Sequence, residues 1–185
     1  MRRAPLVSFW TSPVDTFRAV LDGSSPRGVL LLSALSAWGF VTPGALRPEE
    51  DIAHQFATSV GLTLLPLAAI GALYLRGMVV AHIGQWLGGV ATTAQARLAL
   101  AWSSLPLAAL SLAHLPLLLK SNATHTATGS WALVLAAVLA WSFWTEVKLI
   151  AVAHEFGRLR ATVVSLCSVI LPVLGLLGAG KMFTG

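Results

Sequence analysis

Charged residues are scarce in this sequence, at 10 % of its 185 residues, whereas roughly a quarter of the residues of a soluble domain are charged. Hydrophobic residues make up 56 % of the chain, and the mean hydropathy is +0.79. So few charges cannot cover the surface of an ordinary soluble domain. The composition therefore predicts an integral membrane protein.

Cysteine and catalytic motifs are also rare or missing. The single cysteine, Cys167, excludes a disulfide framework. The sequence has no G-x-S-x-G or H-E-x-x-H motif, and these motifs carry common hydrolytic chemistry. It also lacks the H-x-x-x-H and C-x-x-C spacings that place two metal ligands close together. We therefore expect no enzyme and no cofactor.

Five apolar segments are long enough, at about 1.5 Å per helical residue, to cross a hydrocarbon core of roughly 30 Å. They leave no room for a second folded domain. The predicted fold is all-α, a polytopic five-helix transmembrane bundle at residues 28–185 that follows a cytosolic segment at residues 1–27. The five spans are residues 28–46, 56–80, 98–119, 131–152 and 162–179.

The basic residues predict the orientation of the chain, because cytoplasmic flanks retain Lys and Arg. With the N-terminus inside, only Arg47, Lys120 and Lys181 of the twelve lysines and arginines lie on the outer side. This predicts a multi-pass protein with its N-terminus in and its C-terminus out. Because the basic residues sit at span ends and not on a folded polar face, nucleic acid is not an expected partner, despite the net charge of +5.

The segment before the first span predicts a short amphipathic helix. Ser12 has the residue type of an N-cap, Pro13 suits the first helical position, and Gly23 can end the helix. Apolar residues recur at helical spacing on one side, Phe17 among them. Such a helix is expected to lie in the membrane interface.

A loop rich in glycine is expected between the second and third spans. Thr92 and Gln95 have the spacing of a capping box, so a helix should begin at about Thr93. Three glycines precede this box, where they allow a turn or a close approach of helices. The loop lacks a preceding strand and the G-K-[ST] ending of a phosphate loop, which argues against nucleotide binding. The loop glycines are Gly84, Gly88 and Gly89.

Ionisable residues at membrane depth are costly and mark candidate functional positions. Glu146 shares a polar stripe with Ser142 and His154 on the fourth span, whereas Lys148 points to the opposite side. Arg76 lies at a similar depth on the second span, so we expect an intramembrane pair of Glu146 and Arg76. This pair either fixes the register of the helices or responds to protons or ions.

Polar residues also gather at the inner ends of the spans. They predict a polar cluster on the cytosolic face, in which hydrogen-bonded histidines are favoured over a metal site, because no H-x-x-x-H or C-x-x-C spacing supplies two ligands from one helix. The cluster comprises His82, His154, Glu155, Arg97 and Arg160.

Three stretches together resemble the Yip family of Ypt/Rab-interacting membrane proteins. They are SPVDTFRAVLDGSSPRGVLLL, HIGQWLGGVATTAQARLALAWSSLPLA and WALVLAAVLAWSFWTEVKLIAVAHEFGRLRATVVSLCSVILP. The resemblance implies five spans and a cytosolic N-terminus. In eukaryotes the family is linked to vesicle trafficking and to prenylated GTPases through a long N-terminal domain. Here residues 1–27 alone precede the first span, so the chain is similar to the short prokaryotic members, and a GTPase partner is not expected.

These features lead to two functional hypotheses. The first is a non-catalytic protein of the bacterial inner membrane, which organises the membrane or recruits partners through its cytosolic face. Its partners would be the lipid bilayer, and membrane proteins or a second copy of the chain. The alternative is a small transporter or channel for an ion or small solute that uses the proline-kinked spans and the region of Glu146 and Arg76.

Overall fold

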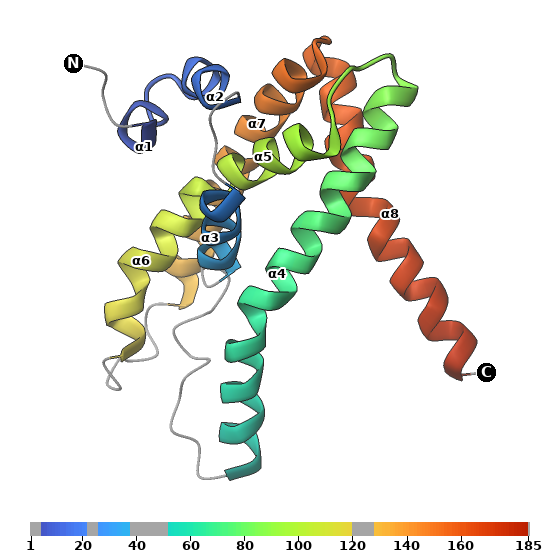
Figure 1. Cartoon of the computed structure of the whole chain (residues 1–185). Helices are drawn as coiled ribbons and strands as arrows, with labels where there is room; N and C mark the ends of the chain where they lie inside the picture. Colours follow the sequence, from blue (N-terminus) through green and yellow to red (C-terminus); the bar gives the residue numbers. More distant parts are fainter. Residues whose placement is uncertain (1–4, 22–25, 38–51, 120–127, 185) are drawn as a thin grey trace. The chain divides into compact units, whose positions relative to one another are not determined.

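The computed structural model describes residues 5–21, 26–37, 52–119 and 128–184. Within these ranges the regular elements are all α-helices (Figure 1). The helices are α1 (Pro5–Ser8), α2 (Pro13–Leu21), α3 (Pro26–Ala37), α4 (Ile52–Trp86), α5 (Thr93–Ser103), α6 (Leu105–Leu119), α7 (Thr128–His154) and α8 (Arg158–Thr184). The predicted helix after Ser12 is present as α2, whereas its place in a membrane interface stays a prediction.

Three helical stretches in the described ranges are long and apolar enough to cross a membrane: Thr63–Trp86, Thr93–Ala113 and Ala132–His154. They correspond to the second, third and fourth predicted spans. Helix α3 covers the start of the first predicted span, and residues 38–46 lie outside the described ranges. Helix α8 covers all of the fifth. The five-span count and its boundaries remain a prediction.

The third predicted span is not one continuous helix. Helix α5 ends at Ser103 and α6 begins at Leu105. Pro106 has no amide hydrogen to continue the helical ladder, and the hydroxyl of Ser104 donates to the Ala101 carbonyl at 2.7 Å. The apolar segment is therefore interrupted where proline removes a backbone donor.

The chain folds as two compact units. Unit 1 comprises the chain up to Gly23, Tyr74–Leu100 and Glu146–Gly185, and unit 2 comprises Ser24–Leu73 and Ala101–Thr145. In unit 2, α3 packs on α6, and the Ser33 hydroxyl donates to the Ala69 carbonyl at 3.1 Å. The predicted site residues all belong to unit 1.

Two helices of unit 1 end in the same way. At the end of α4 the amide of Gly89 donates to the Gly84 carbonyl and the amide of Gly88 to the Gln85 carbonyl. This pair of bonds is a Schellman motif, which places one residue in the left-handed region. Here that residue is Gly88, with φ 87°.

Helix α7 ends in a second Schellman motif, in which Phe156 donates to Ala151 and Glu155 to Val152. Its left-handed residue is Glu155, with φ 58°. A side chain in this region costs about 1 kcal/mol relative to glycine. Glu155 therefore occupies a turn position that its own residue type does not favour.

Candidate functional site

The loop between α4 and α5 is closed by local hydrogen bonds. The hydroxyl of Thr92 accepts from the Gln95 amide at 3.2 Å, and the Gln95 side chain accepts from the Thr92 amide at 2.8 Å. This reciprocal pair is the predicted capping box, and α5 begins at Thr93 as expected. The side-chain amide of Gln85 also donates to the Ala91 carbonyl at 3.2 Å, which ties the end of α4 to the far end of the loop.

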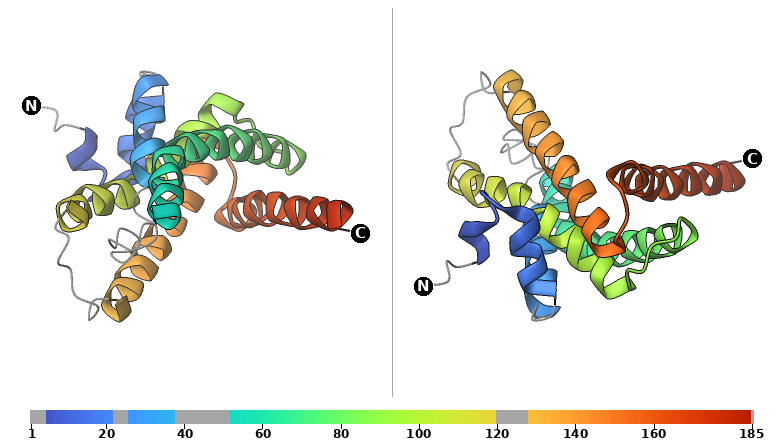
Figure 2. Two further views of the ribbon diagram at one scale, coloured as in Figure 1. Left: turned by 90° about the horizontal axis from the view of Figure 1, so that it is seen from below. Right: turned by 90° about the horizontal axis from the view of Figure 1, so that it is seen from above.

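The α4–α5 loop and the α7–α8 loop lie side by side (Figures 1 and 2), and His154, the last residue of α7, joins them. His154 is 1 % exposed, and its ring lies against Gly84 and Gly89, where any added Cβ atom would overlap it. The Ala91 amide donates to Nδ1 at 3.4 Å, and the Val90 amide donates to the His154 carbonyl at 3.4 Å. The glycines therefore leave the space into which His154 fits.

One further hydrogen bond holds the α7–α8 corner against the α4–α5 loop, and a ring contact lies within the corner itself. The guanidinium of Arg160 donates to the Leu87 carbonyl at 3.0 Å. The ring of Phe156 stacks on His154, with centroids 5.0 Å apart and planes inclined by 10°. The two loops thus form one joined structure built from distant parts of the sequence.

Large apolar side chains project from these joined loops. Trp86 is 83 % exposed, Leu159 is 81 % exposed and Val90 is 62 % exposed. We call these three residues the loop-end surface. Since exposed aromatic and aliphatic side chains mark contact sites for proteins or membranes, this surface is a candidate interaction site.

The second candidate site of unit 1 is a polar contact shared by three helices. Arg76 of α4 donates through Nη2 to Oε1 of Glu146 of α7 at 2.8 Å, and to the hydroxyl of Ser168 of α8 at 3.1 Å. Ser165 of α8 donates to the same Glu146 oxygen. The side chains of Arg76 and Glu146 are 30 % and 10 % exposed. An ion pair at this burial is costly to break, because the remaining partner would keep its charge in a poorly solvated place.

Arg76 and Glu146 are the pair that the sequence predicts, whereas the two serines were not anticipated. Serines in an apolar helix often bond to their own backbone, as Ser168 also does with the Ser165 carbonyl at 2.7 Å. The one sequence signal was their i, i+3 spacing, which places both on one face of α8.

The structure does not gather the predicted polar cluster around one point. His82 is exposed, and its Nδ1 lies 2.8 Å from the Met78 carbonyl on its own helix. Arg97 lies over the Tyr74 ring, 4.4 Å from the centroid, and donates to the Thr93 carbonyl. His82 points away from His154, because it lies two residues before Gly84, the residue of α4 that faces the His154 ring. Among the described residues no three metal-ligand types converge.

Long apolar helices that share a buried ion pair are typical of integral membrane proteins. The sequence matches the Yip1 domain family over residues 7–180, so the chain is a member of this family, and the resemblance seen in the sequence is confirmed. Neither the curated proteins nor the solved structures contain a match to the chain.

Proposed function

We propose that this Yip1-domain protein is non-catalytic and recruits partners, or organises the membrane, through its cytosolic face. One observation carries the proposal. His154 holds the two loops together through its contacts with Gly84 and Gly89, whereas Trp86, Val90 and Leu159 of the loop-end surface remain exposed. Trp86 projects from two loops that are already held together, so binding a partner there requires little further ordering of the backbone and costs little conformational entropy.

The proposal also includes the location of this surface. With five spans and the N-terminus inside, the loop-end surface and α2 would face the cytoplasm of a bacterial inner membrane. The excess of basic residues on these segments supports that orientation. The proposed partners are membrane proteins or a second copy of the chain in the bilayer, with neither nucleic acid nor a GTPase expected.

A photo-cross-linking residue at position 86 or 159 of the full chain tests recruitment in native membranes. Discrete protein adducts are expected from both positions, and a homodimer adduct would identify a second copy as the partner. Leu133 serves as the control position, because it is 74 % exposed but lies within a candidate span. If positions 86 and 159 gave no adducts, or if position 133 gave the same adducts as they do, recruitment through this surface would be contradicted.

A small transporter or channel is the second candidate, and the contact at Glu146 is the observation that favours it. Nε of Arg76 is buried without a hydrogen-bond partner among the described residues, so a polar ligand could complete the site. Purified protein in liposomes would then pass an ion or small solute, and Glu146→Gln would abolish the flux. Flux that is equal for the wild type, Glu146→Gln and empty liposomes would end this hypothesis.

A further inference from the structure

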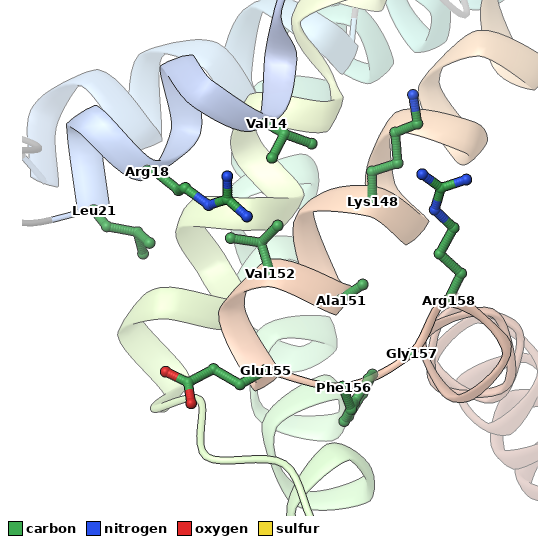
Figure 3. A pocket seen from close by; sticks show the side chains of 10 residues that line it. All are labelled: Val14, Arg18, Leu21, Lys148, Ala151, Val152, Glu155, Phe156, Gly157 and Arg158. Atoms are coloured by element: carbon green, nitrogen blue, oxygen red, sulfur yellow. The ribbon is translucent and has the colours of Figure 1, made fainter.

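A hollow of about 550 Å³ lies in unit 1 between α2 and the corner where α7 turns into α8 (Figure 3). Its volume falls in the range of roughly 300–1,000 Å³ that is usual for small-ligand sites. None of its lining residues belongs to the contact of Arg76 and Glu146. The hollow is therefore separate from the polar contact described above.

Positive charge dominates the lining of this hollow. Lys148 of α7 and Arg158 of α8 approach it with their charged ends on the same side, and Arg18 of α2 projects toward it from the opposite wall (Figure 3). Helix α8 begins at Arg158, so the partial positive charge of its N-terminus adds to the same field. Among the residues that line the hollow, three basic side chains therefore outnumber one acidic side chain.

Among the described residues, the carboxylates of Glu155 and Asp15 lie near these basic side chains. Glu155 is the one acidic residue of the lining, and its carboxylate points away from Lys148 and Arg158 (Figure 3). Asp15 lies 3.6 Å from Arg18 on the same helix, where both side chains are largely exposed. An exposed pair of this kind is weak and exchanges readily with another anion.

The rest of the lining is apolar. Val14 and Leu21 of α2 face Val152 of α7 across the hollow. A ligand that suits both parts must carry an anionic head and an adjoining apolar or glycerol portion. Basic pockets beside membrane helices suit the phosphate groups of anionic lipids for this reason.

We infer that the hollow between α2 and the α7–α8 corner binds a phosphate ester, with Lys148 and Arg158 contacting the phosphate oxygens. The ester is the headgroup of an anionic phospholipid or a soluble phosphate ester such as glycerol phosphate. Arginine can form two parallel hydrogen bonds to phosphate, whereas lysine adds a point charge. The inference does not depend on recruitment through the loop-end surface.

The binding of short-chain lipids to the detergent-solubilised full chain tests this site by calorimetry. Dihexanoyl-phosphatidylglycerol is expected to bind, and dihexanoyl-phosphatidylcholine to bind at least about tenfold more weakly, because its choline cation opposes the basic lining. Arg158→Gln and Lys148→Gln should each weaken the binding of phosphatidylglycerol about tenfold, since each removes a charge-assisted contact. Arg158→Lys keeps the charge and should weaken it less.

Arg27→Gln is the matched control, because it also removes one positive charge, while Arg27 belongs to unit 2 and does not line the hollow. Its affinity for phosphatidylglycerol should equal that of the wild type, and the unfolding temperature of each variant shows that it is folded. Equal binding of the two lipids, or equal effects of Arg158→Gln and Arg27→Gln, would overturn the inference.

Glycerol 3-phosphate separates the two sources of the phosphate. If it displaces phosphatidylglycerol at similar concentrations and loses affinity in Arg158→Gln, the site holds a soluble ester. If it fails to compete while the lipid binds, the site holds a lipid headgroup. Either result supports a phosphate site, whereas failure of both probes to bind overturns it.

Discussion

At the scale of single residues, the fit of His154 against two glycines is a contact of unit 1 that leaves no room for a further side chain. The ring fills the space that a side chain at position 84 or 89 would need. Interiors are close-packed, so even one added methyl group must displace a neighbour. Such a contact explains why glycine stands at position 84 within α4, where it otherwise weakens a helix.

The first prediction concerns Gly84→Ala. We expect this variant to lower the free energy of unfolding by about 1–3 kcal/mol, because the new Cβ atom overlaps His154. Gly71→Ala is the control in the same helix, since a Cβ atom there meets no neighbour within 4 Å, and it should stabilise by about 0.5–1 kcal/mol. The measurement is denaturant unfolding of the purified chain in detergent.

A second variant separates packing from other effects at position 84. If the overlap with His154 is the cause, the double variant Gly84→Ala with His154→Ala should lose less free energy of unfolding than the sum of the losses of the two single variants. Equal unfolding free energies for Gly84→Ala and Gly71→Ala would show that the ring does not occupy this space.

The limits of sequence reasoning are clear at this scale. The box of Thr92 and Gln95 was predictable because its hydrogen bonds join residues three positions apart. The contact of His154 with Gly84 joins residues far apart in the chain, and nothing local in the sequence specifies it. The glycines indicated a close approach, but only the fold shows that a histidine makes it.

At the scale of helices, the contact of Arg76, Glu146 and the two serines connects α4, α7 and α8. Arg76 and Glu146 could be matched from the sequence because both are charged residues at a similar depth in apolar segments. The two serines could not be matched to this pair from the sequence, because a serine hydroxyl in a helix can always bond to a backbone carbonyl of its own helix. The break at Ser104 was likewise only partly visible, because prolines inside helices kink or end them according to their neighbours.

The second prediction asks whether this contact fixes helix register or provides a functional charge. Glu146→Ala should destabilise by about 3 kcal/mol, because Arg76 would keep a poorly solvated charge without its partner. Glu146→Leu combined with Arg76→Met should recover most of that loss, since an apolar pair of similar volume has no charge to solvate. Unfolding in detergent measures both.

Cross-linking from position 86 in membranes and flux in liposomes, measured on the same variants, distinguish a role in helix register from a functional charge. If the double variant unfolds like the wild type and still forms the adducts at position 86, the pair serves the register of the helices. A double variant that is stable but loses adducts or flux would assign the charges a function beyond packing.

At the scale of the whole chain, family membership and helical content agree with the sequence, whereas the number of spans is still a prediction. Length and apolar composition indicate which helices could cross a membrane, but not whether or in which direction they do so, and part of the first predicted span lies outside the described ranges. The side of the membrane on which the α4–α5 loop lies shows how many spans precede it. Two spans place the loop on the side of the N-terminus, whereas one span would place it on the opposite side.

The third prediction uses that loop. Val90→Cys in a Cys167→Ser background should react with a membrane-impermeant maleimide in inside-out vesicles and not in intact spheroplasts, because two spans before Val90 return it to the side of the N-terminus. Val90 is exposed enough to react. A reporter fused to the N-terminus should lie on the same side as Val90, and one fused to the C-terminus on the opposite side. If α4 were the first span, Val90 and the N-terminal reporter would lie on opposite sides, and the loop-end surface could not share a face with α2.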